Sequence, residues 1–211
     1  LGDYHEALKH VEAGLARFDS ARNPRLASVL WVNRVIALSE LDRAAEALPD
    51  VDRVCSIPAD ASGRGALTPH YETMAVAALR AGDVERGREL VSRALAMERE
   101  PIVEEQLEVA LACALLARAE GEPHRALDLL AAVRGHAEHG DVGISLRLRC
   151  AVQQTRSELA EALGDSAGAL AALRSWQRLT QERALMASRA HYQAAALQTE
   201  LLLLLHKLDE K

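Results

Sequence analysis

The stretch Ala81-Gly-Asp-Val-Glu-Arg-Gly-Arg88 decides the fold, because similar stretches occur four more times along the chain. They are Leu1-Gly-Asp-Tyr-His-Glu-Ala-Leu8, Leu41-Asp-Arg-Ala-Ala-Glu-Ala-Leu48, Glu120-Gly-Glu-Pro-His-Arg-Ala-Leu127 and Leu163-Gly-Asp-Ser-Ala-Gly-Ala-Leu170. Their second residues fall at positions 2, 42, 82, 121 and 164, so the spacings are 40, 40, 39 and 43. A nearly fixed spacing of this size indicates a repeated supersecondary unit.

Four features in and just after these stretches predict a helix, a tight turn and a second helix. The second residue is Gly in four of them, and Gly readily adopts the left-handed backbone that ends a helix. The acidic residue after each Gly suits the positive N-terminus of the next helix. Five residues after the turn comes a small residue that lets two helices approach closely: Ala7, Ala47, Gly87, Ala126 and Ala169. Four residues further comes a large aliphatic residue expected in the core: Val11, Val51, Val91, Leu130 and Leu173.

The composition also favours helices over sheets. The 211 residues include 40 Ala and 34 Leu, whereas aromatic residues make up only 3%. Ala and Leu lose little side-chain entropy in a helix, and strands favour β-branched and aromatic side chains instead. The fold class is therefore predicted to be all-α.

The repeat, together with the Pro and Gly positions, predicts where the helices lie. We expect helices over 3–20, 24–40, 43–56, 69–81, 83–99, 101–119, 123–138 and 144–163, with loops at 57–67 and 135–143. A last helix is expected to begin near 166 and to reach about Leu208, because this stretch contains no Pro. Pro49 is expected to kink the third helix or to move its start.

Charge and cysteine content exclude several classes of function. The net charge of −6 argues against a general nucleic-acid or anionic-membrane binder, which would need a basic face. The three cysteines are odd in number and widely spaced, so we expect no disulfide framework and no zinc site, and we expect a cytoplasmic location. The longest apolar run, Leu201 to Leu205, is far shorter than the ~20 residues of a membrane-spanning helix, so no membrane insertion is expected.

The chain contains no motif for phosphate binding, dinucleotide binding, zinc proteolysis or serine hydrolysis. No pair of nucleophile and base can be argued either, so we expect no enzyme activity, cofactor or metal in this chain. His136-Ala-Glu-His139 is interpreted as a solvated helix end, the acidic run Glu98 to Glu108 as a solvated helix start, and Trp176 as a packing residue.

On these turn and small-residue positions, residues 1–177 resemble the tetratricopeptide repeat family. The chain departs from the family in its period of about 40 rather than about 34 residues. It also departs in the aromatic residue of the first helix, which is present as Trp31 and Tyr71 but replaced by Ala110 and Gln153. Long helices of this kind resemble bacterial sensor domains. The resemblance implies a right-handed solenoid of antiparallel helix hairpins, with about four and a half repeats and an incomplete first repeat, and with residues 178–211 extending the last helix.

The resemblance also implies a binding surface on the concave side, formed by the first helix of each hairpin. The residues expected there are Asn33, Ile36, Glu72, Thr73, Val76, Glu108, Leu111, Gln154 and Glu158, with Val32 and Leu115 beside them. In the family, an Asn at the position of Asn33 often holds a peptide backbone. Thr73, Ala112 and Thr155 replace it in the later repeats, so the familiar carboxylate clamp is absent. The aliphatic and acidic mixture favours a protein or peptide ligand with some positive charge; the alternative is that these residues only bridge neighbouring helices.

The end of the chain carries a second, independent pattern. Leu197, Leu201, Leu204 and Leu208 step by 4, 3 and 4 residues, which is typical of a coiled-coil seam. This seam predicts either a homodimer or a linker to a further domain.

Residues 176–183 and 191–201 resemble the junction that leads from such arrays into diguanylate cyclase (GGDEF) domains of proteobacteria. The resemblance implies a sensory or scaffold module that regulates a cyclase in a bacterial signal-transduction protein. A peptide-sensing transcription regulator and a plain assembly scaffold or chaperone adaptor are the alternatives.

Overall fold

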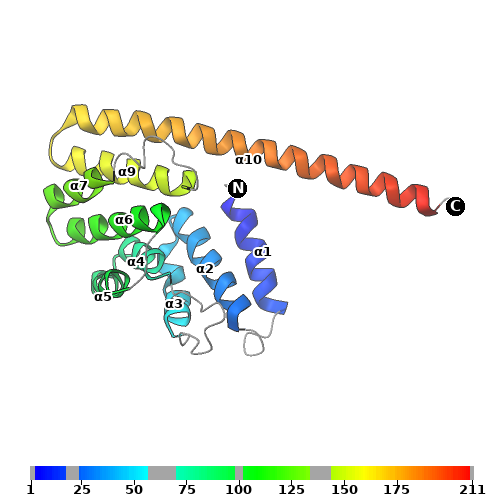
Figure 1. Cartoon of the computed structure of the whole chain (residues 1–211), viewed down its shortest axis with the longest axis horizontal. Helices are drawn as coiled ribbons and strands as arrows, with labels where there is room; N and C mark the ends of the chain where they lie inside the picture. The colour runs from blue at the N-terminus through cyan, green and yellow to red at the C-terminus, as the bar shows by residue number, and fades with distance from the viewer. Residues whose placement is uncertain (1–2, 18–23, 57–69, 98–101, 134–143, 210–211) are drawn as a thin grey trace.

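The computed structural model describes residues 3–17, 24–56, 70–97, 102–133 and 144–209. In this part of the chain all regular structure is helical and there is no strand, which confirms the all-α prediction. The helices are α1 (Tyr4–Arg17), α2 (Pro24–Glu40), α3 (Ala44–Cys55), α4 (Tyr71–Arg80), α5 (Val84–Leu95), α6 (Val103–Ala119), α7 (Pro123–Ala132), α9 (Leu146–Ala162) and α10 (Ser166–Asp209) (Figure 1).

Most helix bounds agree with the sequence pattern to within a few residues, but α5 and α7 are shorter than predicted. They end at Leu95 and Ala132, whereas the pattern extended them to 99 and 138. Leu95 is exposed, so no neighbouring helix buries an extension of α5, and helix propensity alone sustains little helix in water. Pro49 lies exposed inside α3, which is continuous from Ala44 to Cys55. The predicted loops at 57–67 and 135–143 lie outside the described residues.

The turns between paired helices have the predicted backbone. Gly82, Gly121 and Gly164 have φ of 82°, 82° and 76°, and Asp42 takes the same left-handed region at 56°. The Asp after the turn caps the next helix, because Asp83 accepts a hydrogen bond from the backbone N–H of Arg86 at 3.1 Å. These local features fix where each hairpin turns.

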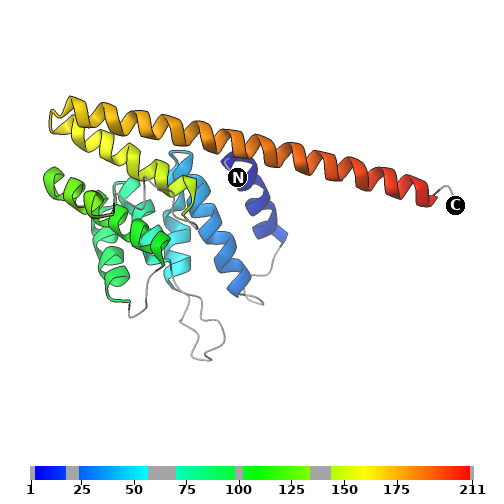
Figure 2. The same ribbon diagram turned by 45° about the horizontal axis from the view of Figure 1, so that its top comes forward.

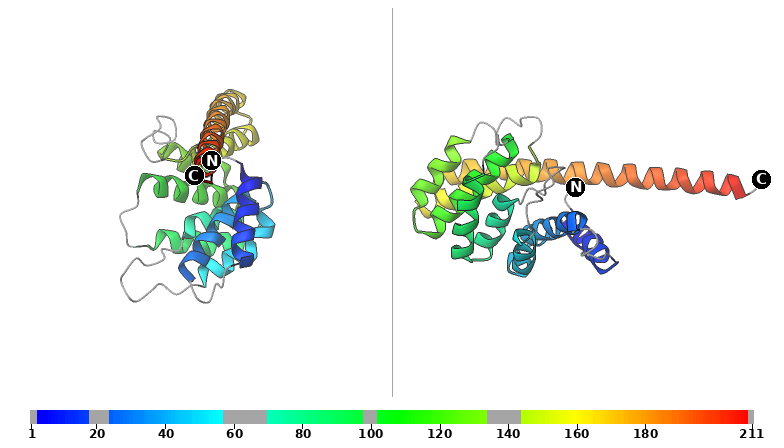
Figure 3. Two further views of the ribbon diagram at one scale, coloured as in Figure 1. Left: turned by 90° about the vertical axis from the view of Figure 1, so that its right-hand side faces the viewer. Right: turned by 60° about the horizontal axis from the view of Figure 1, so that its bottom comes forward.

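The helices form a single row of stacked hairpins (Figures 1 and 3). Within a hairpin, α2 packs on α3, α4 on α5, α6 on α7 and α9 on α10. Each second helix also contacts the first helix of the next hairpin, as α3 does with α4, α5 with α6 and α7 with α9. The first helices α2, α4, α6 and α9 contact one another in order. Each first helix between the ends of the row is therefore packed against helices of both neighbouring hairpins.

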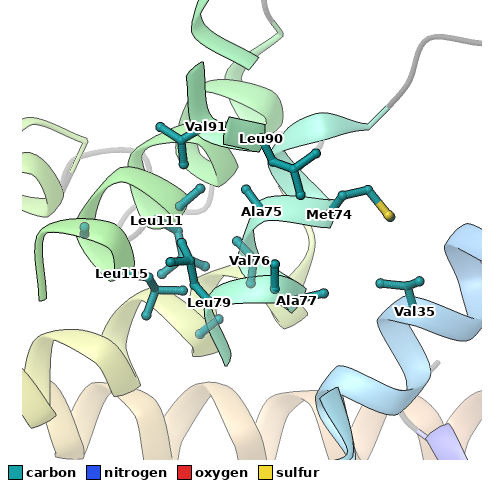
Figure 4. Close-up of a cluster of buried hydrophobic side chains, with 14 of the residues drawn as sticks. Val35, Met74, Ala75, Val76, Ala77, Leu79, Leu90, Val91, Leu111 and Leu115 are labelled. Carbon is teal, nitrogen blue, oxygen red and sulfur yellow. The ribbon is translucent and has the colours of Figure 1, made fainter. Parts of the chain in front are cut away.

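Small residues allow the helices of a hairpin to approach closely. Ala75, Ala114 and Ala126 are fully buried. A Cβ atom added to Gly87 would lie 2.4 Å from a Leu79 methyl group, so α4 and α5 could not pack this closely with a larger residue there. Figure 4 shows part of the resulting core, a single cluster of buried residues to which α2, α4, α5 and α6 all contribute.

The last helix differs from all others in length. α10 has 44 residues, or about 66 Å at ~1.5 Å per residue. Its first part runs back along α9 with Ala172 and Leu179 buried. The helix then passes the row of hairpins and projects away from it (Figures 1 and 2). α10 thus serves as the second helix of a hairpin at one end and as a projecting rod at the other.

Candidate binding site

A cavity of about 480 Å³ lies between the first helices and α10. Residues at or just beyond the C-terminal ends of α2, α4 and α6 form one side, and the middle of α9 and the first half of α10 form the other. The lining residues are Ser39, Glu40, Asp42, Ala44, Arg80, Leu115, Arg118, Cys150, Ala151, Gln154, Thr155, Glu158, Trp176 and Arg183. Side chains from six helices, including Ala44 at the start of α3, and from one turn therefore converge on one space.

Glu40 connects three helices at this cavity. Its Oε1 accepts a hydrogen bond from Nη1 of Arg80 on α4 at 3.3 Å, and its Oε2 accepts one from Nη1 of Arg183 on α10 at 3.1 Å. The Arg183 guanidinium also lies 5.6 Å from the centre of the Tyr4 ring on α1, a cation–π arrangement. Burial raises the pKa of Tyr4, and the neighbouring Glu40 carboxylate raises it further. The link from Arg183 to Glu40 joins α10 to the start of the array.

A second ion pair crosses the cavity between α6 and α9. Arg118 Nη1 donates to Oε2 of Glu158 at 2.5 Å, and the Gln154 amide donates to the other carboxylate oxygen of Glu158 at 3.1 Å. Both members of the ion pair are partly exposed, so the pair marks the mouth of the cavity rather than its floor.

The inner wall carries hydroxyl and thiol groups. The Ser39 hydroxyl oxygen is buried and has no hydrogen-bond partner among the described residues. The Thr155 hydroxyl donates to the backbone carbonyl of Ala151 at 2.9 Å. The Cys150 sulfur lies 3.8 Å from the Thr180 hydroxyl, and burial raises the pKa of this thiol, so Cys150 is a neutral wall residue. Trp176, predicted to be a packing residue, is half-buried and lines the cavity.

The sequence-predicted site residues divide into two groups. Gln154 and Glu158 line the cavity, as does Leu115 beside them. Glu72, Thr73, Val76, Glu108 and Leu111 are buried between helices. Asn33 is exposed and Ile36 half-buried, and neither lines the cavity.

The buried carboxylates have partners inside the array. Glu108 accepts a hydrogen bond from Arg147 of α9 at 3.0 Å, and His70 Nδ1 lies 3.6 Å from a carboxylate oxygen of Glu72, which is only 1% exposed. Glu72 and Glu108 are buried because the first helices lie between neighbouring helices on both sides. Those neighbours cover positions that an isolated hairpin would expose. Ligand binding by these residues stays a prediction, and their burial gives a ligand little surface to contact.

Sequence reasoning missed the charged residues that define the cavity, although a signal for some of them exists. Glu40, Arg80 and Arg118 each stand two or three residues before the residue that turns the chain. Equivalent positions of successive hairpins lie along the same edge of the stack, so the repeat predicts that these three side chains lie near one another. Arg183 carries no such signal, because it lies 143 residues from Glu40.

Other predictions concern side chains that lie outside the described set. The backbone of α10 is helical through Asp209, but the side chains of Leu197, Leu201, Leu204 and Leu208 are not described, nor are His136 and His139. Cys55, Cys113 and Cys150 are all free thiols. Within the described ranges, no three His, Cys, Asp or Glu side chains gather in a way that could hold a metal ion. No helix there is long and apolar enough to cross a membrane.

A comparison of the chain with protein-family models, with curated proteins and with solved structures finds no match.

Proposed function

We propose that this chain is a tetratricopeptide-like recognition module, a right-handed solenoid whose inner face binds a segment of a partner protein or peptide. The observation that carries the proposal is the cavity lined by α2, α4, α6, α9 and α10 and by the first residue of α3. Stacked helical repeats commonly bind their partners on such an inner surface. The cavity volume of about 480 Å³ falls within the ~300–1,000 Å³ of typical ligand pockets.

The stacking pattern supports the repeat part of the proposal. Each second helix contacts both its own first helix and the next one, and successive first helices contact each other. This arrangement follows the period of the sequence repeat, with left-handed turns at three Gly residues. The expectation of a positively charged ligand rested on Glu72, Glu108 and Glu158. The first two are buried, and Glu158 at the cavity already accepts hydrogen bonds from Arg118 and Gln154, so the proposal does not include a positively charged ligand.

The long helix supports the signalling part of the proposal. Trp176 and Arg183 of α10 line the cavity, and the same helix continues to Asp209. A partner that prefers one position of α10 over another would shift the far end of this helix. We extend the proposal to a cytoplasmic bacterial sensory or scaffold module that controls an output domain after α10, with a diguanylate cyclase as the expected output. The continuation of the encoding gene tests this extension, since a helix-turn-helix domain before Leu1 would favour the transcription-regulator alternative.

Selection from a random peptide library on the intact chain tests the recognition site. Gln154→Lys places a longer, charged side chain at the cavity mouth, whereas Ser92→Lys places the same side chain at an exposed position of α5, away from this cavity. We expect selected peptides to bind the wild type and Ser92→Lys but to bind Gln154→Lys at least about tenfold more weakly. Peptides that bind all three equally, or a selection that yields none, would contradict the proposal.

Self-association through the end of α10 is a separate part of the proposal. Replacing Leu201 and Leu204 by Gln removes two seam residues, whereas replacing Leu202 and Leu203 by Gln removes equal apolar surface off the seam. Analytical ultracentrifugation should give a dimer for the wild type and the control and a monomer for the seam variant. Equal masses for the two double variants would rule out the seam.

A further inference from the structure

Most carboxylate acceptors that line the cavity already have hydrogen-bond donors, whereas many of the donors have no acceptor among the described residues. Both carboxylate oxygens of Glu40 accept hydrogen bonds from Arg80 and Arg183, and both oxygens of Glu158 accept them from Arg118 and Gln154. These two lining carboxylates therefore already have donors. Asp42, exposed in its turn, is the remaining carboxylate of the lining.

Donors, in contrast, remain in surplus. A guanidinium group has five N–H donors. Among the described residues, Arg118 and Arg183 each form their cavity ion pair through Nη1, and Arg80 uses Nη1 for both Glu40 and the Ser39 carbonyl at 3.4 Å. No further hydrogen bond of these three guanidinium groups is formed within the described ranges, so their other N–H groups can bind solvent or a ligand.

Ser39 gives a second, independent sign of a ligand. The residue is 7% exposed, it lines the cavity, and its hydroxyl has no hydrogen-bond partner in the described part of the chain. A buried hydroxyl without a partner is costly, and such groups normally bind water or a ligand. The carboxylate of the next residue, Glu40, also lines the cavity and already binds two guanidinium groups.

We infer that the cavity binds a small molecule that carries an oxyanion, a carboxylate or a phosphate, held by the spare donors of Arg118 and Arg183 and by the Ser39 hydroxyl. Guanidinium groups match the geometry of such oxyanions. An oxyanion competes with Glu40 for Arg183 and so loosens the link between α10 and α2. This regulatory consequence rests on the proposed function, whereas the binding itself does not.

One feature of the site opposes an anion. The C-terminal ends of α2, α4 and α6 meet near the cavity, and the carbonyl groups at helix C-termini favour cations. The three arginines of the lining are matched by three carboxylates, Glu40, Asp42 and Glu158, so an oxyanion would have to gain its affinity from directed N–H donors and not from a net positive charge. A cationic ligand is therefore the competing outcome, and the experiment must include one.

Fluorescence of Trp176 provides a direct readout. The chain has two tryptophans, and Trp31→Phe leaves Trp176, which lines the cavity, as the single reporter. This variant is titrated with inorganic phosphate, with succinate and with guanidinium ion, at constant ionic strength. We expect a saturable change with phosphate or succinate and none with guanidinium, and the tighter of the two anions identifies the favoured oxyanion.

A matched pair of arginine variants tests the site itself. Arg118 is paired with Glu158 of the next hairpin, and Arg88 on α5 is paired with Glu120 in the same manner, with side chains 40% and 46% exposed. Both substitutions are made in the Trp31→Phe background. Arg118→Gln should weaken anion binding about tenfold, the usual scale for one charge-assisted hydrogen bond, and Arg88→Gln should leave it unchanged.

Ser39→Ala separates binding from folding, because the hydroxyl it removes has no partner to lose. The variant should bind the anion several-fold more weakly while its denaturation midpoint is unchanged or higher. The inference is overturned if neither anion gives a saturable change, if guanidinium binds instead, or if Arg118→Gln and Arg88→Gln behave alike. The peptide-binding comparison of the wild type with Gln154→Lys uses none of these anions. The proposed peptide recognition and the proposed anion binding can therefore be disproved independently.

Discussion

Leu130 and Leu173 occupy the same position of the repeat, nine residues after the residue that turns the chain, yet the structure treats them differently. Leu130 on α7 is fully buried, whereas Leu173 on α10 is 39% exposed. The helix α9 covers the outer side of α7, and within the described residues no further first helix covers α10 in the same way. A repeat pattern therefore marks a face that is able to pack, and a neighbour decides whether that face is buried.

The opposite face of α10 follows the rule of the earlier hairpins. Ala172 and Leu179 are buried against α9, and the Ser157 hydroxyl of α9 donates to the Ala169 carbonyl at 3.1 Å. α10 is thus packed on one side and open on the other. Its open side includes the exposed Leu170 as well as Leu173.

The largest effect should come from testing this contrast with equal truncations. Leu130→Ala should lower the free energy of unfolding by about 2–5 kcal/mol, because it leaves a cavity in a closed part of the core. Leu173→Ala should lower it by less than ~1 kcal/mol, since the side chain already contacts solvent. Urea denaturation followed by circular dichroism measures both, and similar losses for the two variants would mean that a partner surface covers Leu173 in solution.

Overpacking a close helix contact should have the next largest effect. Ala126 is fully buried, so Ala126→Leu forces α7 away from its neighbours and should cost about 1–3 kcal/mol. Ala131 on the same helix is exposed, and Ala131→Leu should change stability by no more than ~0.5 kcal/mol. If the melting temperatures of the two variants agree within error, the assignment of the small position of the repeat is wrong.

Local features of this fold can be read from the sequence because short-range chemistry determines them. A Gly followed by Asp predicts both the left-handed turn and the cap, as at Gly82 and Asp83. A small residue five positions later predicts a close contact, as at Gly87 against Leu79. None of these inferences requires the path of the rest of the chain.

The candidate site could not be read in the same way, because it depends on how the hairpins stack. Glu40 and Arg183 are 143 residues apart, and only the course of α10 along the row brings them together. Glu72 and Glu108 sit where an isolated hairpin would expose them, but neighbouring hairpins bury both. Their position in the repeat predicts that Glu72 and Glu108 lie on the same helix face. The packing of neighbouring hairpins, which the sequence does not reveal, determines that this face is buried.

The hairpin turns provide a test of structure that depends on local backbone conformation and not on the packing of hairpins. Gly82 has a φ of 82°, and an added Cβ atom would meet no atom within 4 Å. Gly82→Ala therefore tests backbone strain alone and should cost about 1–2 kcal/mol. Thermal denaturation measures this loss, and an unchanged melting temperature would show that the turn relaxes to a right-handed backbone.

The smallest effect should come from the one hairpin turn that lacks Gly. Asp42 holds a φ of 56°, a region that Asp tolerates better than most residues but less well than Gly. Asp42→Gly should therefore raise the free energy of unfolding by about 0.5 kcal/mol, because it relieves this strain. Ala45→Gly, at an exposed site in the first turn of the next helix, should instead lower it by about 0.5 kcal/mol. If urea denaturation shows that Asp42→Gly raises the free energy of unfolding and Ala45→Gly lowers it, the left-handed backbone at Asp42 reduces the stability of the wild type. Destabilisation by both would mean that the Asp42 side chain contributes more to the turn than its strain costs.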